Sequence, residues 1–262
     1  MNGPAEIDLS LARIRAARVD GIGLVVGRRA GPGDGWFSVE ELLSDDSGPA
    51  TLLAMVRGIS EIPADHIRAE WMFESFARAV ADVGAAFIVA ERRLADLSAA
   101  NLLMASTGGL IAGTATIGPD MTVLESDPGA AGPRESGITV APDWRQLAEE
   151  FRGYFTALID PMVDWMVRHR LRQEKALWSA AADRLAQALI WSGAAFDQPD
   201  FARELTVELL DRPGPLAVPL EITVDDRGRE HHRRVSCCLA YRAAGGGFCH
   251  ACPLDGPSLP AR

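Results

Sequence analysis

The residues with the clearest capacity for chemistry are four cysteines, which all lie between positions 237 and 252. They are Cys237, Cys238, Cys249 and Cys252, with the spacing C-C-x10-C-x2-C. Four thiolates can hold a single tetrahedral zinc ion or a [2Fe-2S] cluster. Because the chain shows no recognisable secretory leader, cysteines gathered in one short segment indicate a metal or redox centre.

The adjacent pair Cys237-Cys238 helps to distinguish the two metals. Neighbouring side chains of an extended chain point to opposite sides, so two adjacent thiolates reach one small ion only from a strained backbone. Zinc sites usually separate paired ligands by two to four residues, whereas a two-iron cluster is a larger target. Gly245-Gly246-Gly247 would let backbone N–H groups approach the sulfurs and tune the reduction potential. The spacing favours the cluster, with a structural zinc site or a disulfide as alternatives.

Three histidines lie close to the cysteines in the sequence, namely His231, His232 and His250. Histidine replaces thiolate in Rieske-type centres and raises their potential. With four cysteines available, we predict thiolate ligation. His250, inside the C-x2-C loop, could instead modulate the potential through its proximity.

Basic residues surround the cysteines on a chain whose formal net charge is -10. We predict that four of them dock an acidic electron donor or an anionic chelate: Arg229, Arg233, Arg234 and Arg242. The alternative is a solvated edge strand whose charges discourage aggregation. The acidic balance of the whole chain argues against nucleic-acid binding, which depends on neutralising phosphates with Lys and Arg.

The elements that must position this segment are mainly helical. Apolar spacing and capping residues predict helices over 39–43, 51–56, 65–81, 85–104, 143–159, 161–172, 174–192 and from Pro199 to before Pro213. Gly193 is expected to stop the 174–192 helix in a left-handed conformation. The uncharged run 97–119 is expected to form a buried helix leading into a Gly-rich turn, and not a transmembrane segment. Short strands are expected at 21–26, 121–125 and 137–141.

Four tryptophans fall on predicted helices and are expected in the core: Trp144, Trp165, Trp178 and Trp191. After about residue 215 the apolar period changes from 3.6 to 2. Alternation over 218–224, a turn at 225–228 and a return strand at 229–235 predict a hairpin that leads into the cysteines. The expected fold class is therefore α+β, a mostly helical scaffold with a few short strands and a C-terminal β-hairpin before a small cysteine-ligated cluster module.

These elements divide the chain into three parts. Residues 1–64 form an N-terminal mixed segment, residues 65–215 a mostly helical scaffold and substrate domain, and residues 216–262 the hairpin with the cluster-binding module. The last part is too small to be stable without a staple or support from the scaffold.

The C-C-x10-C-x2-C pattern resembles that of the FhuF-like family of ferric-siderophore reductases. Arg233-Arg234 and Tyr241-Arg242 are similar to the family's surroundings, and the helix containing Leu177-Trp178 is similar to its middle domain. The resemblance implies that the four cysteines hold a [2Fe-2S] cluster, with no catalytic residue beyond these ligands. It also implies one-electron reduction of siderophore-bound Fe(III), which releases iron because oxygen donors hold Fe(II) more weakly.

The chain lacks a nicotinamide or flavin fingerprint, so the electron is expected from a ferredoxin or an NAD(P)H-dependent reductase. We expect a cytoplasmic protein, with peripheral contact at the inner face of the cell membrane beside a siderophore transporter. Two alternatives stay open. One is a ferredoxin-like electron carrier without a chelate pocket, and the other is an iron- or siderophore-binding scaffold with a structural zinc site.

Overall fold

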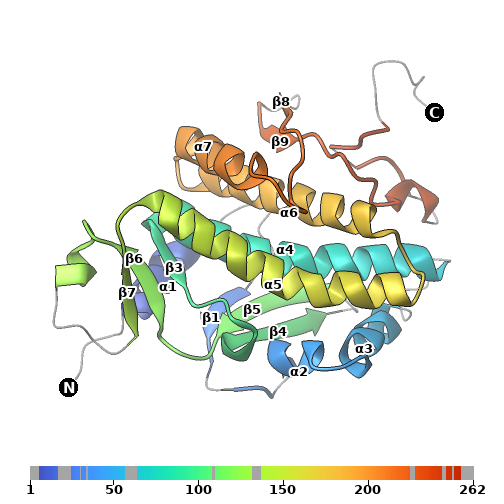
Figure 1. Cartoon of the computed structure of the whole chain (residues 1–262), viewed down its shortest axis with the longest axis horizontal. Coiled ribbons are helices and arrows are strands. Elements are labelled where there is room, and N and C mark those ends of the chain that lie inside the picture. The colour runs from blue at the N-terminus through green and yellow to red at the C-terminus, as the bar shows by residue number, and fades with distance from the viewer. Residues whose placement is uncertain are drawn as a thin grey trace.

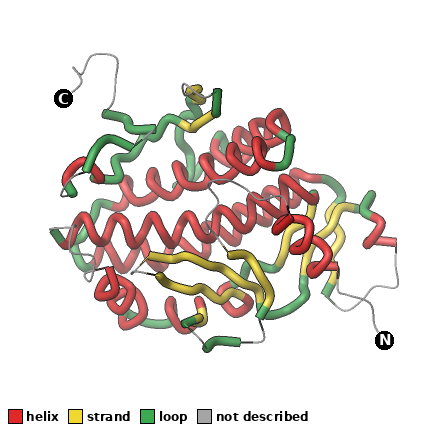
Figure 2. The backbone as a smooth tube through the Cα atoms, turned by 180° about the vertical axis from the view of Figure 1, so that it is seen from behind, coloured by secondary structure: helices red, strands yellow, loops and turns green. Residues whose placement is uncertain are grey.

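The computed structural model describes residues 6–16, 25–29, 31–33, 35–56, 64–107, 110–131, 137–224, 228–243, 246–249 and 251–254. Three long helices form its centre: α4 (Asp65–Glu91), α5 (Trp144–Arg168) and α6 (Glu174–Ala195). Small sheets lie on one side of this helical layer, and the cysteine segment lies on the other (Figure 1). Figure 2 shows the same order of layers from behind. The expected mostly helical α+β fold is confirmed.

The strands form two small sheets below the helices and one hairpin. The first sheet has the order β1 (Val25–Arg28), β5 (Leu110–Thr116), β4 (Leu102–Thr107) and β2 (Trp36–Ser38). The second has the order β3 (Arg93–Ala95), β6 (Met121–Leu124) and β7 (Ile138–Ala141). The strands expected at 121–125 and 137–141 are confirmed and pair in parallel. Of the strand expected at 21–26, residues 21–24 lie outside the described residues and the rest begins β1.

Shorter elements complete the scaffold: α1 (Glu6–Ala16), α2 (Val39–Leu43), α3 (Ser47–Val56) and the 3-10 turns η1 (Ala99–Asn101) and η2 (Pro128–Ala131). The helices expected at 39–43 and 51–56 are confirmed, although α3 begins earlier, at Ser47. Apolar side chains of α1, α2 and α3, such as Ile7, Val39 and Leu52, join the same core as those of α4. None of the helices that the structure describes is both long and apolar enough to cross a bilayer.

Helix α4 is longer than the sequence predicts. The expected break after Ala81 is wrong, because the helix continues through Gly84 to Glu91 and buries most of its residues. It ends where Arg92 takes a left-handed conformation (φ 54°) and donates its backbone N–H to Ile88 O. The predicted helix over 85–104 is correct only for residues 85–91, which belong to α4. The helix expected within 97–119 is wrong, since most of the uncharged run forms β4 and β5. A short apolar run satisfies helix and strand periods alike.

A matched pair of glycine substitutions tests the packing of α4 on α5. A Cβ atom on Gly84 would lie 2.0 Å from the buried Phe151 ring, whereas one on Gly153 would meet nothing within 4 Å. We expect Gly84→Ala to destabilise the fold by about 1–3 kcal/mol through overpacking. Gly153→Ala should stabilise it by about 0.5–1 kcal/mol through helix propensity. Chemical denaturation measures both; a stabilising Gly84→Ala would contradict the close helix contact.

Helices α5, α6 and α7 (Pro199–Leu210) follow most of the predicted boundaries. Asp143 caps α5 by accepting hydrogen bonds from the backbone N–H groups of Arg145 (2.9 Å) and Gln146 (3.1 Å). The expected restart at Pro161 is wrong, because Pro161 lies inside the continuous α5. Gly193 is not a helix stop either: it lies within α6, where an added Cβ would be 2.5 Å from that of Ala202 on α7. Its small size permits this contact.

The predicted C-terminal hairpin is confirmed in a shorter form. Strands β8 (Ile222–Val224) and β9 (Glu230–His232) pair antiparallel, with Ile222 opposite His232. Most of the expected turn, residues 225–227, lies outside the described residues. The hairpin packs beside α6 through β9 and delivers the chain to the cysteines.

Candidate metal centre

The cysteine segment is held on the helical layer by a buried aspartate of α6. Asp183 is 1% exposed. It accepts hydrogen bonds from the backbone N–H groups of Val235 (3.0 Å) and Ser236 (2.9 Å) and from the Ser236 hydroxyl. His232 Nε2 lies 2.9 Å from its Oδ1. One side chain of the scaffold therefore fixes both the end of β9 and the residues just before Cys237.

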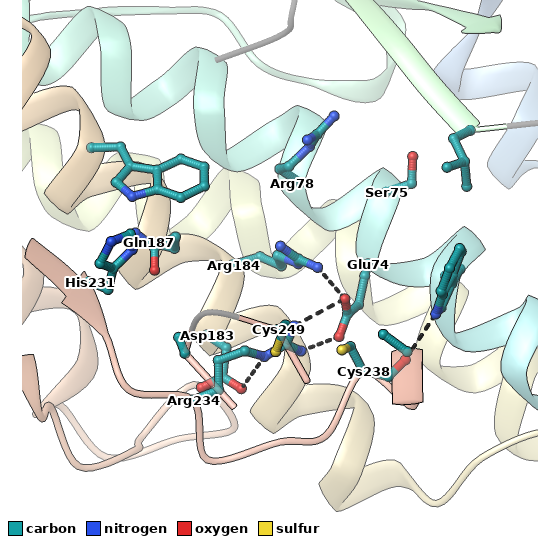
Figure 3. A pocket seen from close by; sticks show the side chains of 15 residues that line it. Glu74, Ser75, Arg78, Asp183, Arg184, Gln187, His231, Arg234, Cys238 and Cys249 are labelled. Atoms are coloured by element: carbon teal, nitrogen blue, oxygen red, sulfur yellow. Dashed lines mark hydrogen bonds and ion pairs between the residues drawn. The ribbon is translucent and has the colours of Figure 1, made fainter. Parts of the chain in front are cut away.

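A second buried carboxylate links the same segment to α4. Glu74, 3% exposed, forms ion pairs with Arg184 of α6 and with Arg234 of the cysteine segment (Figure 3). Although burial alone would raise it, the two guanidinium groups lower the pKa of Glu74. Burial also disfavours the charged form of Arg234 and by itself would lower the pKa of this guanidinium, but Glu74 and Asp183 raise it. Glu74 is thus ionised between two cations and ties α4, α6 and the tail together.

The backbone of the adjacent cysteine pair is also fixed by the scaffold. Trp71 of α4 donates its indole N–H to the carbonyl of Cys238 at 2.9 Å. Arg172, in the turn between α5 and α6, donates to the carbonyl of Cys237 at 3.2 Å and pairs with Glu70 at 2.9 Å. These contacts hold the two carbonyls against helices, so the position of the pair is determined from outside the segment.

Local turns bring the two halves of the cysteine segment together. Leu239 takes a left-handed conformation (φ 59°) directly after the pair and starts the 3-10 turn η3 (Ala240–Arg242). In the second half, Cys252 donates its backbone N–H to Cys249 O at 3.0 Å. Arg234 N–H bonds to Ala251 O at 3.0 Å and joins the halves. Only glycine fits at position 246, where the backbone passes close to that of Ala240, since an added Cβ would lie 2.0 Å from Ala240 O.

All four cysteines are free thiols in the structure. Cys238 and Cys252 are buried, and Cys237 and Cys249 are half-buried. A hydrogen bond from the Cys249 thiol lowers the pKa of Cys238 to about 6, and raises the pKa of Cys249 correspondingly. Burial raises the pKa of Cys237. Among the described residues no three Cys, His, Asp or Glu side chains stand in a metal-binding arrangement, so the four-sulfur ligand set stays a prediction.

The donor chemistry of the segment fits the predicted group. Its thiols are unpaired by disulfides. Cys238 and Cys252 both raise the pKa of Cys237 and of Cys249, which places the four thiols in one neighbourhood. Soft thiolates select zinc or iron-sulfur centres over hard cations. The sulfurs of Cys238 and Cys249 already interact, joining the C-C half to the C-x2-C half.

A cavity of about 360 Å³ opens beside the cysteines, between α4, α6 and the tail (Figure 3). Its lining combines aromatic, basic, acidic, amide and thiol side chains with a few small or apolar ones: Trp71, Glu74, Ser75, Arg78, Leu110, Asp183, Arg184, Gln187, Trp191, His231, Arg234, Cys238, Ala240, Cys249 and Ala251. Two of the predicted ligands, Cys238 and Cys249, therefore face the space that a small molecule would enter.

The predicted docking arginines separate into two kinds. Arg229 and Arg242 are exposed, and Arg233 is half-buried and pairs with Glu221 at 3.2 Å. Arg234 is only 7% exposed, which corrects the expectation that it serves a docking surface. Its charge is used inside the protein, against Glu74 and Asp183, because a buried guanidinium needs carboxylate partners.

The histidines near the cysteines and the four tryptophans of the predicted helices differ in burial. His231 and His232 are buried, at 5% and 0% exposure. His250 lies outside the described residues. Trp165 and Trp178 are buried in the core as predicted, and Trp144 packs partly buried against it. Trp191, expected in the core, lines the cavity instead.

Sequence reasoning missed Glu74, Asp183 and Trp71. A signal was present in α4, where Glu70, Glu74, Arg78 and Asp82 recur every four residues in a stretch, 69–90, that is otherwise apolar except for Ser75. Residues four apart share one helix face, so the series marks a buried polar stripe. On α6, Asp183 and Gln187 show the same spacing.

Asp82, on the polar stripe of α4, makes stability depend on pH. It is 2% exposed, and burial raises its pKa to about 7 despite Arg78, whose Nε lies 4.0 Å away. The ordinary pKa of an aspartate carboxyl is 3.8. At pH values between 3.8 and about 7, Asp82 is therefore protonated in the folded chain but ionised in the unfolded chain. Ionisation of Asp82 therefore costs stability as the pH rises from about 4 to 7.

We expect Asp82→Asn to remove this dependence. The stability of the variant relative to the wild type should increase by about 2 kcal/mol between pH ~5.5 and ~8. Differential scanning calorimetry at the two pH values measures it. If the melting temperatures of the variant and the wild type differed by the same amount at both pH values, the raised pKa of Asp82 would be contradicted.

These observations define a mostly helical protein that carries a thiol-rich C-terminal segment on a buried ionic network. Residues 234–254 match the family model of the FhuF 2Fe-2S C-terminal domain. The matched stretch contains all four cysteines, which confirms the resemblance predicted from their spacing. No curated protein matches the chain.

Proposed function

We propose that the protein reduces siderophore-bound Fe(III) to Fe(II) with a [2Fe-2S] cluster held by Cys237, Cys238, Cys249 and Cys252. The observation that carries the proposal is the cavity, since Cys238 and Cys249 line it directly. The match to the FhuF 2Fe-2S domain supports the choice of cluster. When bound, the cluster supplies one electron at the low potential typical of all-thiolate ligation.

The chain's own residues position the substrate and the tail. Glu74, Asp183, Trp71 and Arg172 fix the cysteine segment against α4 and α6. A ferric chelate in the cavity would take one electron, becoming a ferrous chelate that binds its iron less tightly. No proton transfer by a side chain is needed for this step, so we propose no catalytic residue beyond the ligands.

The electron must be replaced from outside, and we propose a ferredoxin or an NAD(P)H-dependent reductase as the donor. Arg229, Arg233 and Arg242 are our candidates for docking it, since they lie on or near the surface of the hairpin and the cysteine segment. Residues 216–262 would then form the cluster module, supported by a scaffold and substrate domain over 65–215 and the N-terminal segment 1–64. We further propose a cytoplasmic location with peripheral contact to a siderophore transporter at the membrane.

Stopped-flow oxidation of the reduced protein tests this function. Mixing with a series of ferric chelates should give rates that saturate with chelate concentration and differ between chelates, with one Fe(II) formed per electron lost. Rates that rise linearly with every oxidant, without saturation or preference, would indicate an electron carrier instead. A protein that holds zinc and is not reducible would indicate the scaffold alternative.

A further inference from the structure

Leaving its two thiols aside, the lining of the cavity has one more cationic than anionic side chain. Three arginines line it, Arg78, Arg184 and Arg234, against two carboxylates, Glu74 and Asp183. Glu74 pairs with Arg184 and Arg234, and Asp183 is occupied by the tail's backbone and His232. Among the described residues Arg78 keeps one longer ion pair, 4.0 Å to Asp82, which does not line the cavity.

Arg78 is also placed to contact a ligand. Its side chain is about one-third exposed, and the one ion pair it forms among the described residues is to Asp82 at 4.0 Å. Figure 3 shows the guanidinium of Arg78 turned away from Glu74 and its ion-pair partners, Arg184 and Arg234. The raised pKa of Asp82, about 7, means that this carboxyl is largely protonated below neutral pH and compensates Arg78 weakly.

Further groups suit a molecule with oxygen atoms at its surface. Gln187 lines the cavity, and its Nε2 has no hydrogen-bond partner among the described residues. Trp71 and Trp191 supply apolar walls, and the indole N–H of Trp71 is already used by Cys238 O. A volume of about 360 Å³ lies in the range of small-molecule sites, which combine apolar walls with a few polar groups.

We propose that this cavity is the substrate site and selects anionic, oxygen-donor metal chelates, with Arg78 as the charge contact and Gln187 as a hydrogen-bond donor. The inference rests on the proposed reductase function and adds the charge class of its substrate. On a chain of net charge -10, and beside thiolates that add negative charge, Arg78 is the group that would attract an anionic ligand to the cavity. A chelate bound there would lie against the Cys238 and Cys249 side of the tail.

Gallium(III) chelates test the site without any electron transfer, because gallium(III) resembles iron(III) in size and charge but is not reduced. We would titrate the holoprotein with the strongly anionic gallium tris(catecholate) complex and with an uncharged gallium trihydroxamate, following tryptophan fluorescence and calorimetry. The anionic complex should bind more tightly. Arg78→Gln should weaken its binding on the order of tenfold, as expected for loss of one charged hydrogen bond.

Arg145→Gln is the matched control, since Arg145 is an exposed arginine of α5 that pairs with Glu204 and Glu208. It should leave the affinity unchanged, and both variants should keep the wild-type visible spectrum and melting temperature. Equal affinity of Arg78→Gln and wild type, or tighter binding of the uncharged complex, would overturn the proposal. Arg78-dependent gallium binding without reduction of any ferric chelate would instead leave the site standing and refute the reductase function.

Discussion

Replacing Asp183 with alanine is expected to release the cysteine segment from the scaffold and abolish stable cluster binding. The carboxylate accepts from two backbone N–H groups and the Ser236 hydroxyl, and it lies beside His232 and Arg234. Each buried donor left without an acceptor costs about 1–3 kcal/mol, and an uncompensated buried charge about 3–5 kcal/mol.

The expected result is a fall of about 3–5 kcal/mol in the free energy of unfolding and a purified protein with little bound iron. Iron content, visible absorbance and thermal melting measure the effect together. Asp200→Ala is the control, because the Asp200 side chain is 96% exposed at the start of α7. A variant of Asp183 with wild-type iron content would show that the tail does not depend on this anchor.

Glu74→Gln is the second substitution with a large expected effect. The amide keeps the shape of the side chain but removes the charge that compensates Arg184 and Arg234. Breaking one partner of a buried ion pair costs about 3–5 kcal/mol, because the remaining charge stays in a poorly solvated place. We expect the same loss from Arg234→Gln, with a lowered iron content in both variants.

The double variant distinguishes a coupled pair from two independent contacts. If Glu74 and Arg234 compensate each other, Glu74→Gln/Arg234→Gln should be less destabilised than the sum of the single losses, by at least about 1 kcal/mol. Glu204→Gln, an exposed carboxylate with 57% of its side chain accessible, is the matched control and should have no effect. Strictly additive losses in chemical denaturation would contradict the ionic network.

The helices were largely predictable because residues close in the sequence determine where each helix begins and ends. Asp143 caps α5 and Pro199 starts α7, each through a contact within a few positions of the chain. The errors occur where local patterns are ambiguous. The apolar run that forms β4 and β5 fits a helix equally well, and Gly84 and Gly193 break no helix because each gives room to a neighbouring element.

The candidate site was predictable only in part, for the same reason. The spacing of the cysteines identifies the segment, and the family match covers little beyond it. Its anchors lie far away in the sequence: the Glu74–Arg234 pair is separated by 160 positions and the Asp183–Ser236 pair by 53. No local pattern connects such partners, although the four-residue polar spacing on α4 marks one side of the contact.

The placement of these anchors has a functional consequence. The same helices that hold the tail, α4 and α6, also supply Arg78, Gln187 and Trp191 to the cavity. One helix pair therefore fixes the thiols and the walls of the cavity relative to each other. Under the proposed function, this would keep a bound chelate close to the electron source without a moving lid.

Metal and sulfide analysis of protein purified without oxygen tests the central claim, that the four thiolates hold a two-iron cluster, most directly. We predict about two irons and two acid-labile sulfides per chain, a visible chromophore that bleaches with dithionite, and an EPR signal in the reduced state. Cys237→Ser and Cys252→Ser should each lose or distort that signal. One zinc per chain with no acid-labile sulfide would contradict the cluster and remove the basis for the reductase function.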